Sequence, residues 1–406
     1  MRSENSPGPI LRLTIAAAAA ATAVIVVGAA LGFGRGHWAA ALVALPLLIA
    51  AVVAARIAYP RLLVATATAL GFLLVAIATG GLVALVNDAR WAVAVHVAAA
   101  GASLTASLIA IVVSFRGEPV AFGPWRDYIT LTKPRIMSLL LLTGAAGMFV
   151  GANGWPDGRV FLAMMLGLAL ACGGSSALNH VMDADIDRLM GARTAARPVA
   201  SGRVAAPRAL EFGVALMALS FALLATTVNV LTAVLALAGG LFYVVVYTGY
   251  LKRSTDRNIV IGGAAGAVPP LVGFAAATGN LTVPAACLFL IVFLWTPPHF
   301  WALALMIKEH YQAANVPMLP TTRGERETTR QILLYSIVLV AFTVAVGWWL
   351  GPVYTIAAVV LGAYFVLLAW KLRHDTTRRR AFVLFHYSLA YLALLFVAAA
   401  VNPLVI

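Results

Sequence analysis

Thirteen apolar stretches of about 20 residues follow one another along this chain of 406 residues, and each could cross a hydrocarbon core as one helix. Because 63% of the residues are hydrophobic and only 10% are charged, no sizeable soluble part is expected. The sequence predicts an all-α integral membrane protein and excludes a soluble enzyme, a disulfide scaffold and an outer-membrane barrel. The predicted spans are 10–33, 38–58, 61–86, 91–115, 133–153, 159–180, 208–229, 231–250, 258–279, 282–306, 331–350, 352–371 and 381–402.

Basic residues predict how these spans are oriented, because Lys and Arg accumulate in cytoplasmic loops. The net charge of +14 is attributed to such loops, so no nucleic acid partner is expected. The first span, 10–33, is longer than the apolar core of a signal peptide and is predicted to be a retained anchor. The sequence thus predicts a multi-pass cell membrane protein with its N-terminus and basic loops in the cytoplasm and its C-terminus outside. The basic loops are 188–203, 252–257, 308–326 and 371–380.

A polar segment, RGEPVAFGPWR at 116–126, divides the spans into four and nine. We therefore expect a four-helix transmembrane domain at 1–119 and a nine-helix domain at 124–406.

Three of the chain's 14 acidic residues lie within five positions, in ALNHVMDADIDRLM. On a helix, Asn179, Asp183 and Asp187 share one face because they are four residues apart. Oxygen ligands of this kind suit Mg²⁺, which also binds the phosphates of substrates. The alternative is a solvated acidic helix end.

Arginines follow this acidic segment, and Arg193, Arg197 and Arg203 carry the planar group that fits phosphate oxygens. Acidic and basic groups together predict a site for a metal-bound diphosphate. The competing interpretation is that these arginines only set the orientation of the chain in the membrane.

Two further segments carry polar groups at the ends of spans. In YTGYLKRSTDRNIVIGGAAGA, Tyr247, Lys252, Arg253 and Asn258 precede a glycine-rich helix, whose glycines allow close approach of a helix or a substrate. In LWTPPHFWALAL, two prolines are expected to interrupt a membrane helix beside His299 and Trp301. A histidine at this depth is a functional candidate, and a kinked packing helix is the alternative.

Several motifs together resemble the UbiA superfamily of intramembrane prenyltransferases and, within it, the protoheme IX farnesyltransferase family. The resemblance covers roughly Pro124 to Asn402. It is carried by YITLTKPRIMSLLLLT, by the spacing of Asn179, Asp183 and Asp187, and by RTAARP, NIVIGGAAGA, WTPPHFWALAL, YQAANVPMLP and LFHYSLAYLALLF.

The resemblance implies nine helices around a central cavity and transfer of a farnesyl group from farnesyl diphosphate to a vinyl group of haem b, with Mg²⁺ as the cofactor. It implies catalytic roles for Asn179, Asp183, Asp187, Lys252 and Arg253. Where the family commonly has an aspartate, this chain has His310, so either Glu309 takes over the metal-facing role or a second metal is held less well. The residues implied to bind substrate are Lys133, Arg135, Arg193, Arg197, Tyr247, Asn258, His299, Trp301 and Glu309.

The first four spans lie outside this resemblance and are weakly similar to one half of haem A synthase. His96 is the position that matches a haem-ligating histidine of that protein. The sequence leaves two interpretations open, a structural bundle and a haem-contacting half-module. Membrane lipid, a haem A synthase and a second copy of the chain are the partners considered.

Two other functions are also considered. One is a UbiA-type prenyltransferase that acts on an aromatic acid or a quinone precursor, which would be expected to lack the WTPPHFW and NIVIGGAAGA strings. The other is a membrane protein that handles haem without catalysis, which would not need the acidic face.

Overall fold

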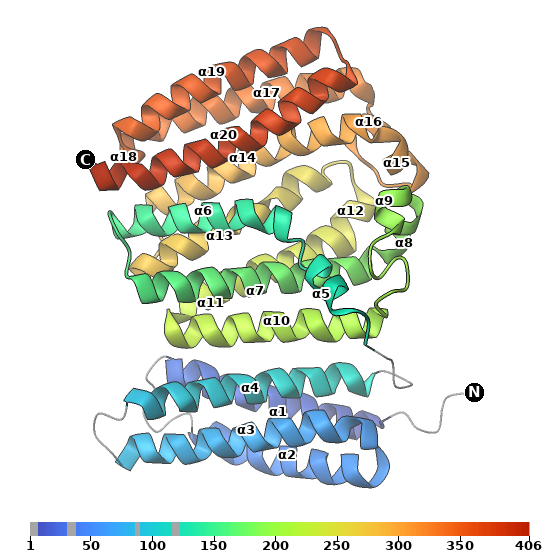
Figure 1. Cartoon of the computed structure of the whole chain (residues 1–406), viewed down its shortest axis with the longest axis vertical. Coiled ribbons are helices and arrows are strands. Elements are labelled where there is room, and N and C mark those ends of the chain that lie inside the picture. The colour runs from blue at the N-terminus through green and yellow to red at the C-terminus, as the bar shows by residue number, and fades with distance from the viewer. Residues whose placement is uncertain (1–6, 31–37, 86–89, 116–121, 406) are drawn as a thin grey trace.

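The computed structural model describes residues 7–30, 38–85, 90–115 and 122–405, and their regular structure is entirely helical (Figure 1). Thirteen helices in these residues are long and apolar enough to cross a membrane, which confirms the predicted fold class. They are α1 (Pro9–Ala30), α2 (Trp38–Ala58), α3 (Pro60–Leu85), α4 (Arg90–Ser114), α6 (Pro134–Ala152), α7 (Gly158–Met182), α10 (Ala206–Thr227), α11 (Val230–Leu241) with its continuations, α13 (Asn258–Thr278), α14 (Val283–Met306), α17 (Gly324–Ala345), α19 (Pro352–His374) and α20 (Arg378–Val405).

Shorter elements connect or extend the spans, mostly at one end of the molecule (Figure 1). Helix α11 continues through a π-helix, η1 (Phe242–Leu251), into α12 (Lys252–Ser254). The other short helices are α5 (Trp125–Leu131), α8 (Ala184–Leu189), α9 (Ala192–Ala195), α15 (Lys308–Ala313), α16 (Leu319–Thr322) and α18 (Gly347–Leu350).

Helix α14 runs without interruption from Val283 to Met306, so the prediction that Pro297 and Pro298 break it is wrong. Proline removes a backbone donor, but a membrane helix tolerates it where other groups satisfy the freed carbonyls. The carbonyls left without a helical donor are those of Phe293 and Leu294, four residues before Pro297 and Pro298. The span predicted at 331–350 was also misplaced, because α17 begins at Gly324 and its polar first turns extend the helix.

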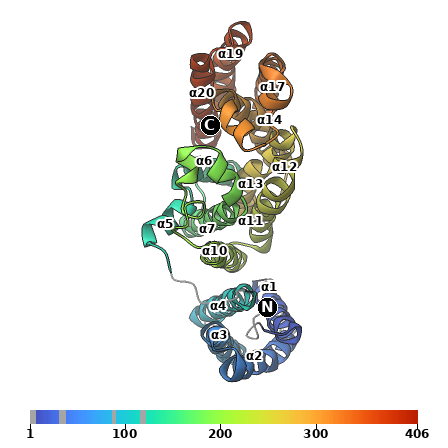
Figure 2. The ribbon, with the colours of Figure 1, turned by 90° about the vertical axis from the view of Figure 1, so that its right-hand side faces the viewer.

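A large hydrophobic cluster joins α6, α13 and α14 to α17, α19 and α20. Its largest fully buried side chains are aromatic: Tyr354, Phe365, Tyr391 and Phe396. Figure 2 views the helices nearly end-on and shows α7, α10 and α11 below α6 and α13, with α14 and the last helices above. This stacking places the C-terminal ends of α7 and η1 on the same side of the molecule (Figure 1).

Helices α1 to α4 pack together as a bundle (Figure 2). The bundle has a small core of its own, yet a second hydrophobic cluster continues from it into α7 and α10. At this contact α4 lies so close to α10 that a Cβ on Gly101 would stand 2.6 Å from the Cβ of Ala222. Part of the expected domain boundary, residues 116–121, lies outside the described residues.

Candidate active site

The acidic segment lies where α7 ends and α8 begins. Asn179 is in the last turns of α7, Asp183 is its C-cap, and Asp187 is in α8. The helix is interrupted at Asp183, but the Asp187 amide still donates to the Asp183 carbonyl over 2.8 Å, so the four-residue spacing persists. The three residues are buried, with exposed fractions of 3%, 1% and 1%.

Each of these three side chains contacts a cation from a different part of the chain. Lys133 Nζ donates to Asn179 Oδ1 over 2.7 Å, and Lys252 Nζ donates to Asp183 Oδ2 over 2.6 Å.

The third contact joins Arg197 Nη1 to Asp187 Oδ1 over 2.6 Å. Buried carboxylates are retained only when they are paired, so these cations stabilise the acidic segment as it stands. The structure thus brings together six of the residues that the sequence predicted: Lys133, Asn179, Asp183, Asp187, Arg197 and Lys252.

One oxygen of each buried aspartate is left unpaired. Asp183 Oδ1 and Asp187 Oδ2 are buried and accept no hydrogen bond. Such oxygens are rare in folded proteins and call for an explanation, of which a bound ion is one. The donor set fits Mg²⁺, which typically takes one or two carboxylates and completes its shell with water and phosphate oxygens.

Two features limit how a metal would be held. A metal ion would meet Asn179 only if Lys133 released the amide oxygen. Among the described residues, no group of three His, Cys, Asp or Glu side chains is arranged to hold a metal ion. A site built on two carboxylates therefore depends on oxygens from a substrate or from water.

An uncommon backbone conformation positions Lys133. Its φ of 50° and ψ of 60° lie in the left-handed region, directly before Pro134 starts α6. Residues other than glycine seldom adopt this conformation, which is found where a site requires it. Burial and the positive charge of Arg197 lower the pKa of Lys133 to about 7, and the carboxylate of Asp183 opposes this shift.

The π-helix η1 supplies a contact that the sequence analysis missed. The Thr248 hydroxyl accepts a hydrogen bond of 3.0 Å from Asn179 Nδ2 and donates to the Tyr243 carbonyl. Asn179 Nδ2 also donates to Asp183 Oδ2 over 2.7 Å. π-Helices occur frequently at functional sites, and this one carries the chain from the membrane to Lys252.

Arg253 lies beside Lys252 but makes a different contact. It forms a bidentate pair with Asp185, with both distances 2.7 Å, and donates to the Met182 carbonyl. The side chains of Arg253 and Asp185 are 37% and 64% exposed, so this pair lies on the surface. The hydrogen bonds from Arg253 lower the pKa of Asp185 to about 2.

The remaining basic candidates lie at the surface. Arg135 and Arg193 are exposed, and within the described residues neither forms a hydrogen bond or ion pair with the buried aspartates. Arg203 forms a bidentate pair with Asp127 over 2.9 and 3.1 Å, which ties the loop before α10 to α5. The structure therefore gives Arg203 a linking role and leaves Arg197 as the arginine of the buried cluster.

Asn258 and Tyr247 hold the neighbouring loops and helices. Asn258 Nδ2 donates to the carbonyls of Thr255 and Pro317, so it joins the start of α13 to the segment after α15. The ring of Tyr247 lies where a Cβ on Gly262 would be, which explains that glycine as a close contact.

The segment around Glu309 lies on α15. Glu309 and His310 are both exposed, and the His310 ring lies near Gly191, where an added Cβ would be 3.2 Å from His310 Nε2. The metal-facing role of Glu309 stays a prediction.

His299 and Trp301 are both buried in α14 but face different neighbours. His299 stacks between Trp295 and Phe385, at ring distances of 4.3 and 4.6 Å, and its Nδ1 is 2.7 Å from Ser388 Oγ. Ser388 was missed because an isolated serine in an apolar helix follows no pattern. Trp301 packs edge-on against Tyr335 of α17 in the large cluster.

In the N-terminal bundle, His96 is buried in α4 and its Nδ1 is 2.6 Å from the Ala76 carbonyl of α3. A backbone carbonyl at this distance fixes the orientation of the imidazole ring.

The sequence of this chain is similar to those of known membrane prenyltransferases. A model of the UbiA prenyltransferase family matches residues 140–400. A protoheme IX farnesyltransferase of Symbiobacterium thermophilum is 53% identical over 67% of this chain and 92% of its own length. One from Pseudomonas putida is 49% identical over 68% and 94%. A third, from Roseiflexus sp., is 50% identical over 69% of this chain, but the match spans only 53% of that longer relative.

Solved structures similar to this one confirm the fold. A digeranylgeranylglyceryl phosphate synthase has a TM-score of 0.58 at 18% identity and covers 69% of this chain and 99% of its own. A UbiA homologue of Archaeoglobus fulgidus, bound to GPP and Mg²⁺, has a TM-score of 0.52 at 17% identity and covers 67% and 99%.

Proposed function

This chain belongs to the UbiA prenyltransferase family, among its protoheme IX farnesyltransferases, and we propose that it transfers a farnesyl group from farnesyl diphosphate to haem b. In this reaction the bond from the farnesyl carbon to diphosphate breaks, a bond to a vinyl carbon of haem forms, and water supplies a hydroxyl. The products are haem O, diphosphate and a proton. The observation that carries the proposal is the buried cluster of two half-paired aspartates and three cations.

In this proposal the cluster binds the diphosphate. Asp183 and Asp187 would hold Mg²⁺ through their unpaired oxygens, and Asn179 would join them if Lys133 turned to the substrate. Bound Mg²⁺ would stabilise negative charge on the departing diphosphate. Lys133, Lys252 and Arg197 lie within the same cluster, so they are suited to bind the phosphate oxygens and to stay there as the charge develops.

Water must reach the reaction only after the farnesyl group has been transferred. The charged cluster has apolar and aromatic neighbours. These neighbours are a small group of hydrophobic side chains from α8, α13, α14 and α15, and Tyr247, Phe300 and Tyr311 pack against it. Such surroundings exclude water and stabilise an allylic cation. No nucleophile from the protein is needed, since the electrons come from the vinyl group.

The acceptor distinguishes this proposal from a quinone-type prenyltransferase. Purified chain in lipid nanodiscs, with farnesyl diphosphate and Mg²⁺, should prenylate haem b and leave an aromatic acid such as 4-hydroxybenzoate unchanged. The product is identified by mass analysis as haem b that has gained one farnesyl group and one hydroxyl. Prenylation of the aromatic acid alone would overturn the proposal, and so would binding of haem without any turnover.

Lys252 and Arg253 are expected to differ, although they are neighbours. Removing the buried ammonium in Lys252→Met should raise the KM for farnesyl diphosphate about tenfold or more, since a charged hydrogen bond is lost. Arg253→Gln breaks a surface pair with Asp185 and a hydrogen bond to the Met182 carbonyl, and should change KM by less than about threefold. Steady-state kinetics on both variants tests this difference, and equal effects would contradict it.

We further propose that the protein is a multi-pass protein of the cell membrane with the cluster on the cytoplasmic side. The basic loops at 188–203, 252–257, 308–326 and 371–380 support this orientation. Contacts with a haem A synthase or with a second copy of the chain stay predictions.

The two-domain organisation leads to a test by truncation. Every residue of the buried cluster lies after residue 124, so deleting residues 1–118 should leave farnesyl transfer within a few-fold of the full chain. The deletion would uncover the face of α10 that packs against α4. This face is apolar, so lipid can replace α4 there. The activity is measured per amount of membrane-inserted protein. Complete loss of activity in a stably inserted truncation would refute two separable domains.

The role of His96 as a haem contact is a separate proposal. Its ring is oriented by the Ala76 carbonyl, as the rings of metal-bound histidines usually are. If it contacts haem, His96→Ala should weaken haem retention by the purified full chain and change the haem absorption spectrum. Unchanged retention and spectra would leave the four helices a structural role.

A further inference from the structure

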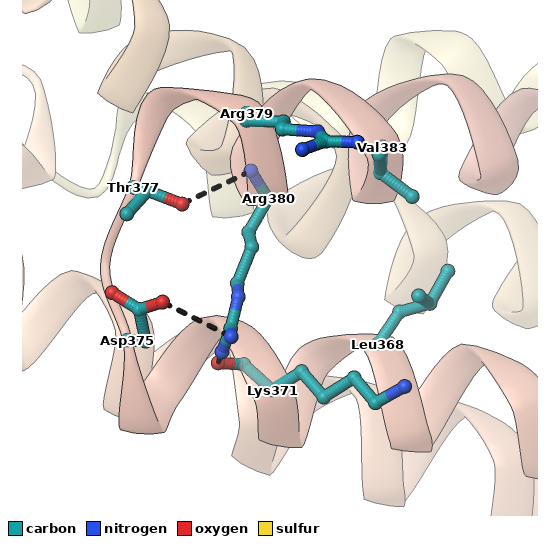
Figure 3. Close-up of a pocket in the computed structure, with 7 residues that line it drawn as sticks. All are labelled: Leu368, Lys371, Asp375, Thr377, Arg379, Arg380 and Val383. Carbon is teal, nitrogen blue, oxygen red and sulfur yellow. Dashed lines mark hydrogen bonds and ion pairs between the residues drawn. The ribbon is translucent and has the colours of Figure 1, made fainter.

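The turn between α19 and α20 forms an open pocket of about 460 Å³ (Figure 3), and none of its lining residues belongs to the buried cluster. Five basic residues and one acidic residue lie between Lys371 and Arg380, so the turn is strongly basic. The residues that line the pocket include Leu368, Lys371, Asp375, Arg379, Arg380 and Val383.

The cations of this pocket differ in how they are held. Arg380 is fixed, because its guanidinium pairs with Asp375 over 3.0 Å and donates to the Lys371 carbonyl over 2.6 Å. Within the described residues, Lys371 and Arg379 are engaged in no ion pair. Figure 3 shows them on opposite sides of the pocket, with Lys371 on α19 and Arg379 on α20. Two unpaired cations therefore face a space that already has one anchored guanidinium.

The other wall of the pocket is apolar. Leu368 and Val383 line it on the side of the membrane spans, which end at His374 and resume at Arg378. Trp370 and Phe382 are 49% and 53% exposed close by, and exposed aromatic side chains are typical of the membrane interface. The turn lies at the same end of the molecule as α8 and α15, where the other basic loops gather (Figure 1).

From this arrangement we propose that the α19–α20 pocket binds the headgroup of an anionic phospholipid, with its phosphate between Lys371 and Arg379 and its acyl chains along Leu368 and Val383. Basic pockets between membrane helices on the cytoplasmic side have the chemistry for such headgroups. Free phosphate carries negative charge, as the lipid headgroup does, but it has no acyl chains to contact the apolar wall. The apolar wall and the membrane-level position favour the lipid.

The pocket is tested by native mass spectrometry of the full chain with equal amounts of dioleoyl phosphatidylglycerol and dioleoyl phosphatidylcholine. The wild type should retain phosphatidylglycerol in preference. The double variant Lys371→Gln, Arg379→Gln should lose this preference about tenfold or more. Arg378→Gln is the matched control, since Arg378 carries the same charge in the same turn but does not line the pocket. It should keep the preference.

Two more variants separate the pocket from charge in general. Val383→Phe keeps every charge but fills the apolar wall, so it should also weaken retention of phosphatidylglycerol. Lys371→Arg preserves the charge and should retain the lipid.

Three results would overturn the proposal. These are an unchanged lipid preference in the double variant, an equal loss in Arg378→Gln, and displacement of phosphatidylglycerol by millimolar inorganic phosphate. The last would assign the pocket to free phosphate.

Discussion

Asp183→Asn is expected to lower turnover about 100-fold or more while the protein remains inserted in the membrane. The substitution keeps the size of the side chain but removes the charge of a carboxylate that is 1% exposed and has one unpaired oxygen. Asp187→Asn should have a similar effect, because Asp187 Oδ2 is unpaired in the same way. Asn179→Ala should also be severe, since Asn179 orients Asp183. Turnover is measured as haem product formed per inserted protein.

Asp185→Asn is the matched control for this prediction. It removes a carboxylate from the same short segment, but one that is 64% exposed and paired with Arg253. We expect it to keep activity within a few-fold.

Loss of stability must be separated from loss of catalysis, because Asp183→Asn leaves the ammonium of Lys252 without its carboxylate. The double variant Asp183→Asn, Lys252→Met removes both charges and should be as stable as the wild type but remain inactive. Wild-type turnover in well-expressed Asp183→Asn would contradict the role of this aspartate.

Removing divalent cations is expected to abolish activity, with a loss of about 100-fold or more. The unpaired oxygens Asp183 Oδ1 and Asp187 Oδ2 would repel a diphosphate placed beside them unless a metal cation lay between. The measurement is farnesyl transfer after treatment with EDTA, followed by return of Mg²⁺.

Mg²⁺ should restore activity, and the binding of farnesyl diphosphate should weaken in its absence. The binding of farnesyl diphosphate is measured separately from turnover. A fall in turnover that is caused by weaker haem binding is then not attributed to removal of the metal. Full activity after exhaustive removal of metal would contradict the assignment of Asp183 and Asp187 as metal-binding residues.

The membrane fold could be predicted from the sequence because apolar runs of sufficient length form helices in a bilayer whatever their neighbours. The ends of the spans were less certain. Helix α17 starts seven residues before the predicted position, since a polar helix can extend beyond the membrane and leaves no apolar signal. Helix α14 continues through Pro297 and Pro298, because a membrane helix tolerates prolines that a local pattern would place at a break.

The local part of the candidate site could be predicted from the sequence, whereas the contacts between distant segments could not. The spacing of Asn179, Asp183 and Asp187 is a local feature, and the structure retains it across the break between α7 and α8. The basic residues of the site were predicted as phosphate-binding groups, but their ion pairs and hydrogen bonds join positions far apart in the chain. The contact of Lys133 with Asn179 spans 46 residues and that of Lys252 with Asp183 spans 69, so only the fold could supply them.

Two contacts had no signal in the sequence. Thr248 lies in a mostly apolar π-helix, whose i→i+5 hydrogen bonding has no marker in the sequence. Ser388 contacts His299 across 89 residues.

The most direct test of the central claim is to express the chain in a host that makes only haem b and to extract the haems for mass analysis. The wild type should yield haem O, which is haem b with an added farnesyl group and a hydroxyl. The Asp183→Asn variant, inserted to the same level, should leave only haem b. Haem b alone from the inserted wild type, or equal haem O from both chains, would contradict farnesyl transfer by this cluster.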